Sequence, residues 1–218
     1  MDLEAELAAA RDLDVTAIAD AIESIGFACT RCGHCCRGLG EEEHTATVFP
    51  DEIREIQRAG DEDWREVARP MPFGLTETDE EMQTGETFEW ALQTDACGDC
   101  TFYDEKGEAC AIYENRPLIC RTYPFSLAIE DDGAETSTPM GDVVDREGAV
   151  QAHECAGLGR DISREDAEEL ATTLKERAIR ERREAIGVRD NYEPTDVDGV
   201  VVHDSEGQKR PDGRPIEE

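Results

Sequence analysis

The sequence predicts an α+β fold, in which short strands or hairpins flanked by helices surround a cysteine-rich centre. Apolar residues recur at helical spacing near both ends of the chain, while the middle holds short alternating or aromatic runs. Eight of the nine cysteines fall between residues 29 and 120. Only 38% of the 218 residues are hydrophobic, so we expect something besides apolar burial to organise this small, irregular domain.

The first element is a helix that leads into the cysteines. Residues 14–26 read DVTAIADAIESIG and place apolar side chains at helical spacing, at Val15, Ile18, Ile22 and Ile25. Gly26 is a suitable helix C-terminus. We therefore expect residues 1–26 to form an N-terminal helical segment.

The middle of the chain predicts short elements. HTATVFP alternates like a strand, residues 50–60 and 61–70 each indicate a brief helix, and TFEWALQ at 87–93 indicates another strand. The polar residues 74–86 indicate a loop. DEKGE predicts the turn of a hairpin that carries Cys100 and Cys110, and a second hairpin is expected to turn at Asp132-Gly133.

A long amphipathic helix is expected near the C-terminus. SREDAEELATTLKERAIRERREAI opens with a Ser-x-x-Asp capping box and keeps one apolar stripe. Beyond Gly187 the sequence lacks periodicity and is rich in Asp, Gly, Pro and Glu. The expected organisation is a cysteine-cluster domain at 27–160, a helix at 161–187 that packs on it, and an acidic mobile tail at 188–218.

The charge is strongly acidic, with 54 Asp and Glu against 22 Lys and Arg and a net charge of -32. A disordered acidic chain would lack the periodic apolar segments present here. A folded protein from the salt-saturated cytoplasm of a halophilic archaeon explains both features better, because salt screens the self-repulsion. No basic face is available for nucleic acid, and no signal peptide or apolar run of ~18 residues indicates a membrane. We expect a cytoplasmic protein.

Four of the cysteines lie in the eight residues CTRCGHCC, at 29–36. Cytoplasmic thiols are normally reduced, and a disulfide between adjacent cysteines such as Cys35 and Cys36 is strained. The C-x-x-C-x-x-C spacing instead suits convergent thiolates around zinc or an iron-sulfur cluster. Because neighbouring side chains on an extended backbone point to opposite faces, the Cys35-Cys36 doublet either bridges two metals or divides between two sites.

Three segments together resemble a known family. CTRCGHCCR, CTFYDEKGEACAIYENRPLICRTYPF and HECAGLG resemble the cysteine-cluster proteins described as zinc- or iron-chelating, over roughly residues 27–160. The resemblance implies eight metal ligands and leaves Cys97 outside the pattern. These ligands are Cys29, Cys32, Cys35, Cys36, Cys100, Cys110, Cys120 and Cys155. The family does not choose between zinc and iron, and the three-step cysteine loop favours an iron-sulfur cluster.

Two functions are open. The protein is a metal-binding scaffold, carrier or partner-binding module, or it is a cluster-dependent enzyme for redox or methyl-transfer chemistry, as suspected for relatives that are flagellin lysine methylases. No glycine-rich turn after a strand indicates a methyl-donor site. Structural zinc sites contribute about 10–16 kcal/mol in small peptides, so chelation is expected to unfold the middle of the chain.

The side chains around the cysteines have weaker assignments. The arginines beside the predicted ligands either neutralise the sulfurs or pair with surface carboxylates. These are Arg31, Arg37, Arg116 and Arg121. His153 is the better alternative ligand, His34 is expected to be an exposed turn residue, and His44 and His203 are expected at the solvated surface. The aromatic residues near Pro124 are expected to exclude water.

Overall fold

The computed structural model describes residues 2–38, 43–77, 83–104, 109–129 and 142–216. It combines helices with several small sheets of short strands, which confirms the predicted α+β class. The chain divides into two compact units. Unit 1 comprises Met1–Cys36, Tyr103–Ala111 and Leu118–Arg182, and unit 2 comprises Arg37–Phe102, Ile112–Pro117 and Arg183–Glu218.

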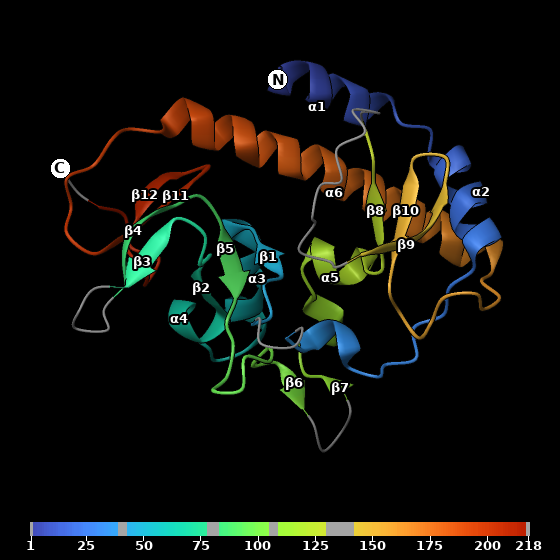
Figure 1. The fold of residues 1–218 in the computed structure, drawn as a ribbon, viewed down its shortest axis with the longest axis horizontal. Coiled ribbons are helices and arrows are strands. Elements are labelled where there is room, and N and C mark those ends of the chain that lie inside the picture. The colour runs from blue at the N-terminus through green and yellow to red at the C-terminus, as the bar shows by residue number, and fades with distance from the viewer. Residues whose placement is uncertain (1, 39–42, 78–82, 105–108, 130–141, 217–218) are drawn as a thin grey trace. The chain divides into compact units, whose positions relative to one another are not determined.

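Unit 1 contains a three-stranded antiparallel sheet with helices beside it. Its helices are α1 (Leu3–Asp12), α2 (Val15–Ile25) and the first part of α6 (Arg164–Asn191). The sheet has the order β8-β10-β9, from Phe125–Leu127, Val150–His153 and Val143–Glu147. Figure 1 shows α2 beside β9 and β10. Helices α2 and α6 confirm the two helices predicted at the ends of the cysteine region.

An apolar cluster fills the space between these elements. Its buried members come from α2, the sheet and α6. They are Ile18, Ala19, Ala21, Ile22, Phe125, Val150, Ala152, Ala167, Ala171 and Leu174. Phe27, directly after α2, packs edge-on against the fully buried Phe125 with 5.6 Å between ring centroids. Unit 1 therefore has an apolar core of its own.

Three short elements complete unit 1 and carry cysteines. They are the 3-10 turn η1 (His34–Cys36), the hairpin of β6 (Tyr103–Asp104) and β7 (Ala109–Cys110), and helix α5 (Leu118–Thr122). The β6–β7 hairpin confirms the hairpin predicted around DEKGE, although Cys100 precedes it and only Cys110 lies on a strand. The turn predicted at Asp132-Gly133 lies outside the described residues, and β8 pairs with β10.

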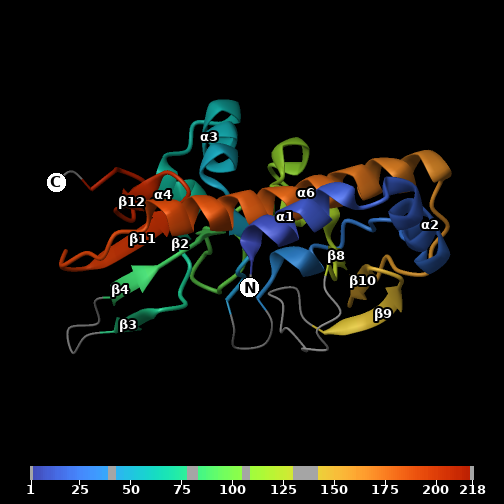
Figure 2. The same cartoon turned by 90° about the horizontal axis from the view of Figure 1, so that it is seen from above.

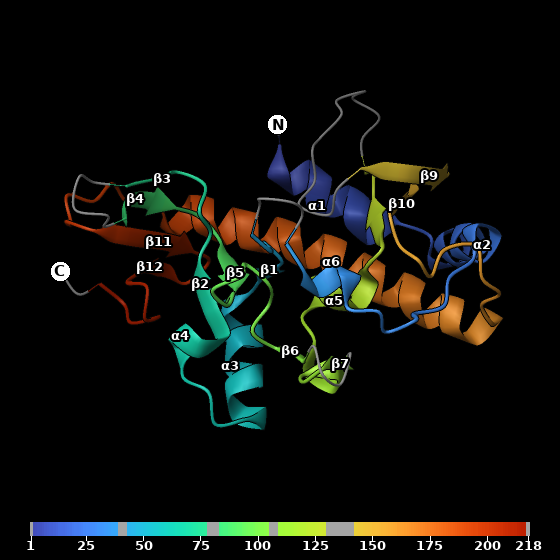
Figure 3. The same cartoon turned by 60° about the horizontal axis from the view of Figure 1, so that its bottom comes forward.

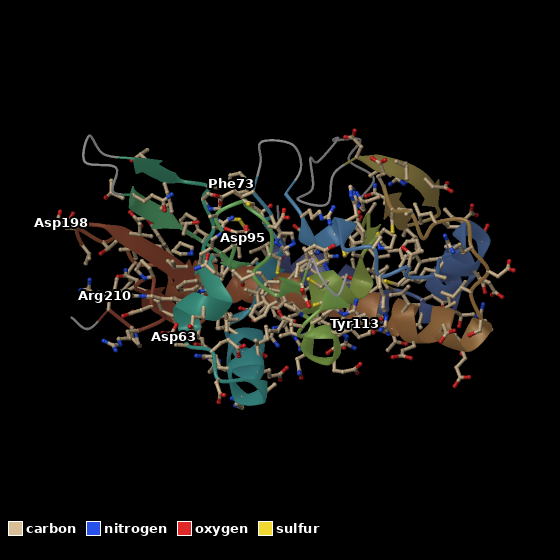
Figure 4. All side chains as sticks on the ribbon, turned by 90° about the horizontal axis from the view of Figure 1, so that it is seen from below. Asp63, Phe73, Asp95, Tyr113, Asp198 and Arg210 are labelled. Carbon is tan, nitrogen blue, oxygen red and sulfur yellow. The ribbon has the colours of Figure 1, made fainter. Side chains whose placement is uncertain are left out.

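Unit 2 begins with a small antiparallel sheet of order β1-β5-β2. Its strands are Thr47–Val48, Trp90–Leu92 and Ala68–Pro70. Helices α3 (Pro50–Ala59) and α4 (Trp64–Val67) connect β1 to β2 and lie beside each other (Figure 3). Asp63, labelled in Figure 4, caps α4 by accepting from the main-chain N–H of Arg65 at 2.8 Å. The predicted strands near 44–50 and 87–93 and the helix at 50–60 are confirmed. The helix predicted at 61–70 is confirmed only at Trp64–Val67, because Ala68–Pro70 form β2.

The second sheet of unit 2 differs from the sequence prediction. It has the order β12-β11-β4-β3, from Gly207–Lys209, Val200–Asp204, Gln83–Thr87 and Leu75–Glu77 (Figure 2). Residues 74–86 were expected to form a loop and residues 188–218 a tail without regular structure, and both expectations are wrong for these strands. β4 and β11 pair in parallel across more than a hundred residues of sequence, so a local pattern does not reveal them.

A buried polar network fixes the C-terminal strands within unit 2. The Lys209 ammonium lies 2.7 Å from the Asp204 carboxylate, which also accepts from Trp90 Nε1 at 2.9 Å. All three side chains are buried, and Glu206 completes the network at 2.6 Å from Lys209. Hydrogen bonding to Arg54 lowers the pKa of Glu206 to about 2 against the cost of its burial, with a further contribution from Lys209. Ionised groups thus hold residues 204–209 in place.

Candidate metal centre

Main-chain contacts join residues 26–28, which precede the cysteine loop at 29–36, to residues 157–159, which follow Cys155. We call these contacts the clamp. Phe27 and Leu158 form an antiparallel bridge. The Ala28 N–H donates to the Gly157 carbonyl at 3.0 Å, and the Gly159 N–H donates to the Gly26 carbonyl at 2.9 Å. The clamp brings residues 26–28 alongside residues 157–159. Cys29 and Cys155 are next to these segments in the sequence and therefore lie close to each other.

Two glycines permit this close approach. A Cβ atom on Gly157 would lie 2.5 Å from the Ala28 carbonyl oxygen, and one on Gly26 would lie 2.6 Å from the Arg160 carbonyl oxygen. Gly26 also has φ = 76°, which favours glycine. Both obstacles are main-chain atoms, which cannot rotate away. The sequence signal for this role of Gly157 is its position two residues after Cys155.

The cysteine loop after the clamp is compact. Arg31 and Gly33 adopt positive φ of 55° and 72°, and the Cys36 N–H then donates to the Gly33 carbonyl at 2.9 Å to close η1. Gly33 lies against Tyr103, because a Cβ there would be 2.1 Å from the tyrosine ring. Tyr103 pairs with Cys110 in the β6–β7 hairpin, so this contact places the hairpin beside the loop.

The electrostatics of Cys155 show which thiols lie near it. Burial raises the pKa of Cys155, the Gly157 N–H lowers it, and the charges of three loop cysteines raise it again. We call these residues the four-thiol cluster: Cys29, Cys32, Cys35 and Cys155. Negative charge on the loop cysteines therefore makes the Cys155 thiol harder to ionise. A bound cation would remove that repulsion, which is the chemistry expected of a thiolate metal site.

Tyr123 lies at the same place. Burial raises the pKa of its hydroxyl, and so do the nearby charges of Cys155, Cys35 and Glu154. The hydroxyl donates to the Glu154 carbonyl, directly before Cys155. This position agrees with the predicted role of the aromatic residues near Pro124 in limiting water beside the sulfurs.

A hydrogen bond from the main chain orients Cys155. Its sulfur accepts a hydrogen bond from the Gly157 N–H at 3.3 Å, and its side chain is half-buried. N–H···S bonds stabilise a thiolate and orient it. Cys29, Cys32 and Cys35 are all exposed.

Three further predicted ligands belong to unit 1. Cys36 ends η1, Cys110 lies on β7 and Cys120 lies in α5, and each is half-buried. Cys35 is exposed whereas Cys36 is not, so the doublet presents its two sulfurs to different surroundings. Unit 1 therefore holds seven of the eight predicted ligands.

An arginine missed in the sequence supports the helix that carries Cys120. Arg177, in α6, donates to Thr122 Oγ1 at 3.0 Å and to the Phe125 carbonyl at 3.4 Å. Thr122 is fully buried and is the last residue of α5. Arg177 also forms an i, i+4 ion pair with Glu181 at 2.7 Å.

The remaining cysteines, Cys97 and Cys100, belong to unit 2. They lie in a tight loop after β5, in which Asp95 Oδ1 accepts from the Cys97 N–H at 2.8 Å (Figure 4). Cys100 is 5% exposed, and its main chain forms an isolated antiparallel β-bridge with Thr94. Cys97 is exposed. Cys97, which the family pattern omits, is thus at the surface of this loop.

The arginine and histidine side chains discussed with the cysteines differ in how far their positions agree with the sequence predictions. Arg116 donates to the Tyr113 carbonyl at 3.0 Å and covers the Tyr113 ring. His34 is exposed, as predicted. His153 is fully buried with Nε2 2.8 Å from Ser126 Oγ, so this nitrogen is already engaged within the core. His44 and His203 are 8% and 1% exposed, which corrects their assignment to the surface.

All nine cysteines lie in the described residues, and no disulfide joins any of them. Within those residues, no three His, Cys, Asp or Glu side chains are already arranged as metal ligands. The four-thiol cluster has a donor set that fits a soft or borderline cation, but its loop must close to bring the sulfurs to coordination distance.

The described helices include none that is long and apolar enough to cross a membrane.

Comparison with known proteins matches residues 28–156 to the CxxCxxCC family, described as "Putative zinc- or iron-chelating domain". The match begins one residue before Cys29 and ends one residue after Cys155. It therefore encloses every cysteine of the chain. No curated protein and no solved structure matches the chain.

Proposed function

Because this chain belongs to the CxxCxxCC family, we propose that its four-thiol cluster binds a zinc or iron ion through thiolates. The observation that carries the proposal is the main-chain clamp, which brings Cys155 beside the loop that holds Cys29, Cys32 and Cys35. Thiols bind a metal as thiolates, so binding releases protons and strengthens as pH rises.

The clamp and the loop make different contributions to metal binding. The clamp fixes Cys155 beside the start of the loop, and the Gly157 N–H stabilises the charge on its sulfur. The C-x-x-C-x-x-C spacing lets the loop supply three further thiolates. A divalent ion with four thiolates carries about -2 of charge at the site. Exposure of the loop to water and salt compensates part of that charge.

The proposal places one ion at the four-thiol cluster and leaves the other four predicted ligands outside it. Those are Cys36, Cys100, Cys110 and Cys120. This arrangement divides the sulfurs of the Cys35-Cys36 doublet between different surroundings. The stoichiometry of bound metal measures whether more than one ion binds.

Elemental analysis of protein purified without oxygen tests the proposal. We expect the Cys29→Ser and Cys155→Ser variants each to lose about one equivalent of metal, because a four-coordinate site keeps little affinity with three thiolates. Cys97→Ser is the matched control and should retain the full content. Unchanged metal content in both cluster variants would refute the assignment of these ligands.

Absorption spectroscopy then separates zinc from an iron-sulfur cluster. The three-step cysteine loop favours the cluster, which would make the protein brown, while zinc would leave it colourless. In the colourless protein, replacement by Co²⁺ gives thiolate-to-cobalt bands whose intensity reports how many thiolates bind. Brown protein would support the cluster-dependent enzyme, and colourless protein would support a metal-binding role.

A further inference from the structure

Two exposed aromatic rings of unit 2 contact each other. Phe88 directly follows β4 and is 48% exposed, while Tyr192 directly follows α6 and is 42% exposed. Their ring centroids lie 5.8 Å apart. Single exposed apolar side chains are ordinary on protein surfaces, whereas neighbouring exposed rings are typical of surfaces that bind a partner.

A buried histidine packs against both rings. His203, in β11, is 1% exposed and stacks on Phe88 with 5.3 Å between ring centroids and 22° between ring planes. The Tyr192 ring centroid lies 4.9 Å from the same imidazole, and His203 Nε2 lies 2.6 Å from Glu86 Oε2. One face of the Phe88 ring is thus covered by the imidazole, and its exposure comes from the remaining surface of the ring. We call Phe88, Tyr192 and His203 the aromatic patch.

Hydrogen bonds on both sides of Tyr192 hold its ring in position. Directly before it, Asn191 Nδ2 donates to the Ser205 carbonyl at 2.7 Å, where the end of α6 lies beside β11 (Figure 2). Directly after it, the Glu193 carbonyl accepts from Gln208 Nε2 at 2.6 Å. A ring that is fixed before a partner arrives loses little further conformational freedom on binding.

The residues beside the rings are acidic, which indicates a cationic partner. Glu89 follows Phe88 directly, Glu193 follows Tyr192 directly, and both are exposed. The face of an aromatic ring attracts cations, and the planar guanidinium of arginine stacks on it while donating to carboxylates. We propose that the aromatic patch is a docking site for an arginine side chain of a partner protein.

Stacking on the rings differs from general attraction to an acidic surface. The net charge of -32 attracts any cationic peptide, and salt screens this attraction. In 1 M NaCl the screening length is about 3 Å, so only contacts at short range keep most of their strength. The contribution of the rings should therefore persist at a salt concentration that removes the general attraction.

Titration with a designed peptide in 1 M NaCl tests the proposal. A blocked peptide of alternating glycine and arginine is compared with the same peptide carrying citrulline, which resembles arginine in shape but has no charge. Calorimetry should show tighter binding of the arginine peptide. Proton NMR of the unsubstituted protein should show the arginine side-chain protons shifted upfield by the ring currents, and this result stands even if a variant does not fold.

Variants that keep the net charge locate the binding. Phe88→Leu retains an apolar side chain but removes the ring, so the Kd of the arginine peptide should rise about 2–5-fold. Phe88→Trp should bind at least as tightly as the unsubstituted protein, because indole is the best ring for a cation. Val144→Ala, which shortens an exposed apolar side chain of unit 1, is the control and should leave the Kd unchanged.

Three outcomes would overturn the docking site. The first two are equal affinities for the arginine and citrulline peptides, and equal Kd values for the unsubstituted and Phe88→Leu proteins. The third is sedimentation that shows dimers of the unsubstituted protein and monomers of Phe88→Leu, because the rings would then form a contact between copies. The aromatic patch belongs to unit 2 and the four-thiol cluster to unit 1, so none of these outcomes depends on metal binding.

Discussion

Substitution of Gly157 by alanine tests whether the clamp positions Cys155. The new Cβ would lie 2.5 Å from the Ala28 carbonyl oxygen and 2.9 Å from the Phe27 ring. Contacts this short must be relieved by a shift of the main chain. The shift would break the hydrogen bond from the Ala28 N–H to the Gly157 carbonyl, which is 3.0 Å long in the native protein.

The expected loss of stability follows from three contributions. Overpacking costs about 1–3 kcal/mol, and the lost hydrogen bond costs about 1 kcal/mol. Replacing glycine by alanine returns about 0.4–1 kcal/mol by restricting the unfolded chain. The free energy of unfolding should fall by about 1–3.5 kcal/mol. At about 2–4 °C per kcal/mol for a chain of this size, the melting temperature should fall by about 2–14 °C.

Urea denaturation and Zn²⁺ titration measure the two consequences. Displacing a group that orients a metal ligand typically lowers affinity about 10–100-fold, and we expect a loss in that range. Gly60→Ala is the control, because its Cβ would meet only the end of the Glu62 side chain, which can rotate away. A Gly157→Ala protein that melts and binds Zn²⁺ like the control would refute the role of the clamp.

Three other perturbations follow from the same contacts. Arg177→Met removes two hydrogen bonds to buried acceptors and should lower the free energy of unfolding in urea by about 1–3 kcal/mol, whereas the exposed Arg183→Met should change it by less than about 0.5 kcal/mol. Because Arg54 lowers the pKa of Glu206 to about 2, its carboxylate stabilises the protein above about pH 4.5 and loses this effect as pH falls toward 2. Glu206→Gln should therefore lower the melting temperature at pH 7 and match the unsubstituted protein near pH 2. Because the protein carries a net charge of -32, its carboxylates repel one another, and salt screens this repulsion. The melting temperature should therefore rise between 0.1 and 1 M NaCl, where the screening length falls from about 10 to about 3 Å. A melting temperature that does not change with salt would show that self-repulsion does not limit stability.

Local sequence patterns predicted the helices of this fold much better than its sheets. The helical spacing from Val15 to Ile25 and the capping box at Ser163 are properties of neighbouring residues, and both helices form. Strands β4 and β11 stabilise each other across the chain, and β4 contains Gly85 and polar residues that suggest a loop. The charged residues of β11 and β12 likewise suggest a tail, but Asp204 and Lys209 neutralise each other in the core.

The family resemblance implied the set of eight ligands, whereas the proposed grouping of the thiols required the fold. The loop from Cys29 to Cys35 is visible in the sequence as a repeated three-residue step. Cys155 lies more than a hundred residues away, and only the clamp between Phe27 and Leu158 explains why it joins that loop. The sequence could not divide Cys35 from Cys36 beyond the expectation that their side chains differ in direction, because that division depends on the 3-10 turn and on burial.

The separation of core and thiols changes the expected effect of chelation. From the sequence alone, a metal worth about 10–16 kcal/mol in small peptides should hold the middle of the chain folded. In those peptides the ion substitutes for a core, whereas unit 1 has buried Ile22, Phe125 and Leu174 between its helices and sheet. The binding energy should then appear mainly as affinity and as order in residues 29–36. Chelated protein that keeps its α2 and α6 helicity and gains amide exchange only near the loop would support this view, and cooperative unfolding on chelation would support the view from sequence.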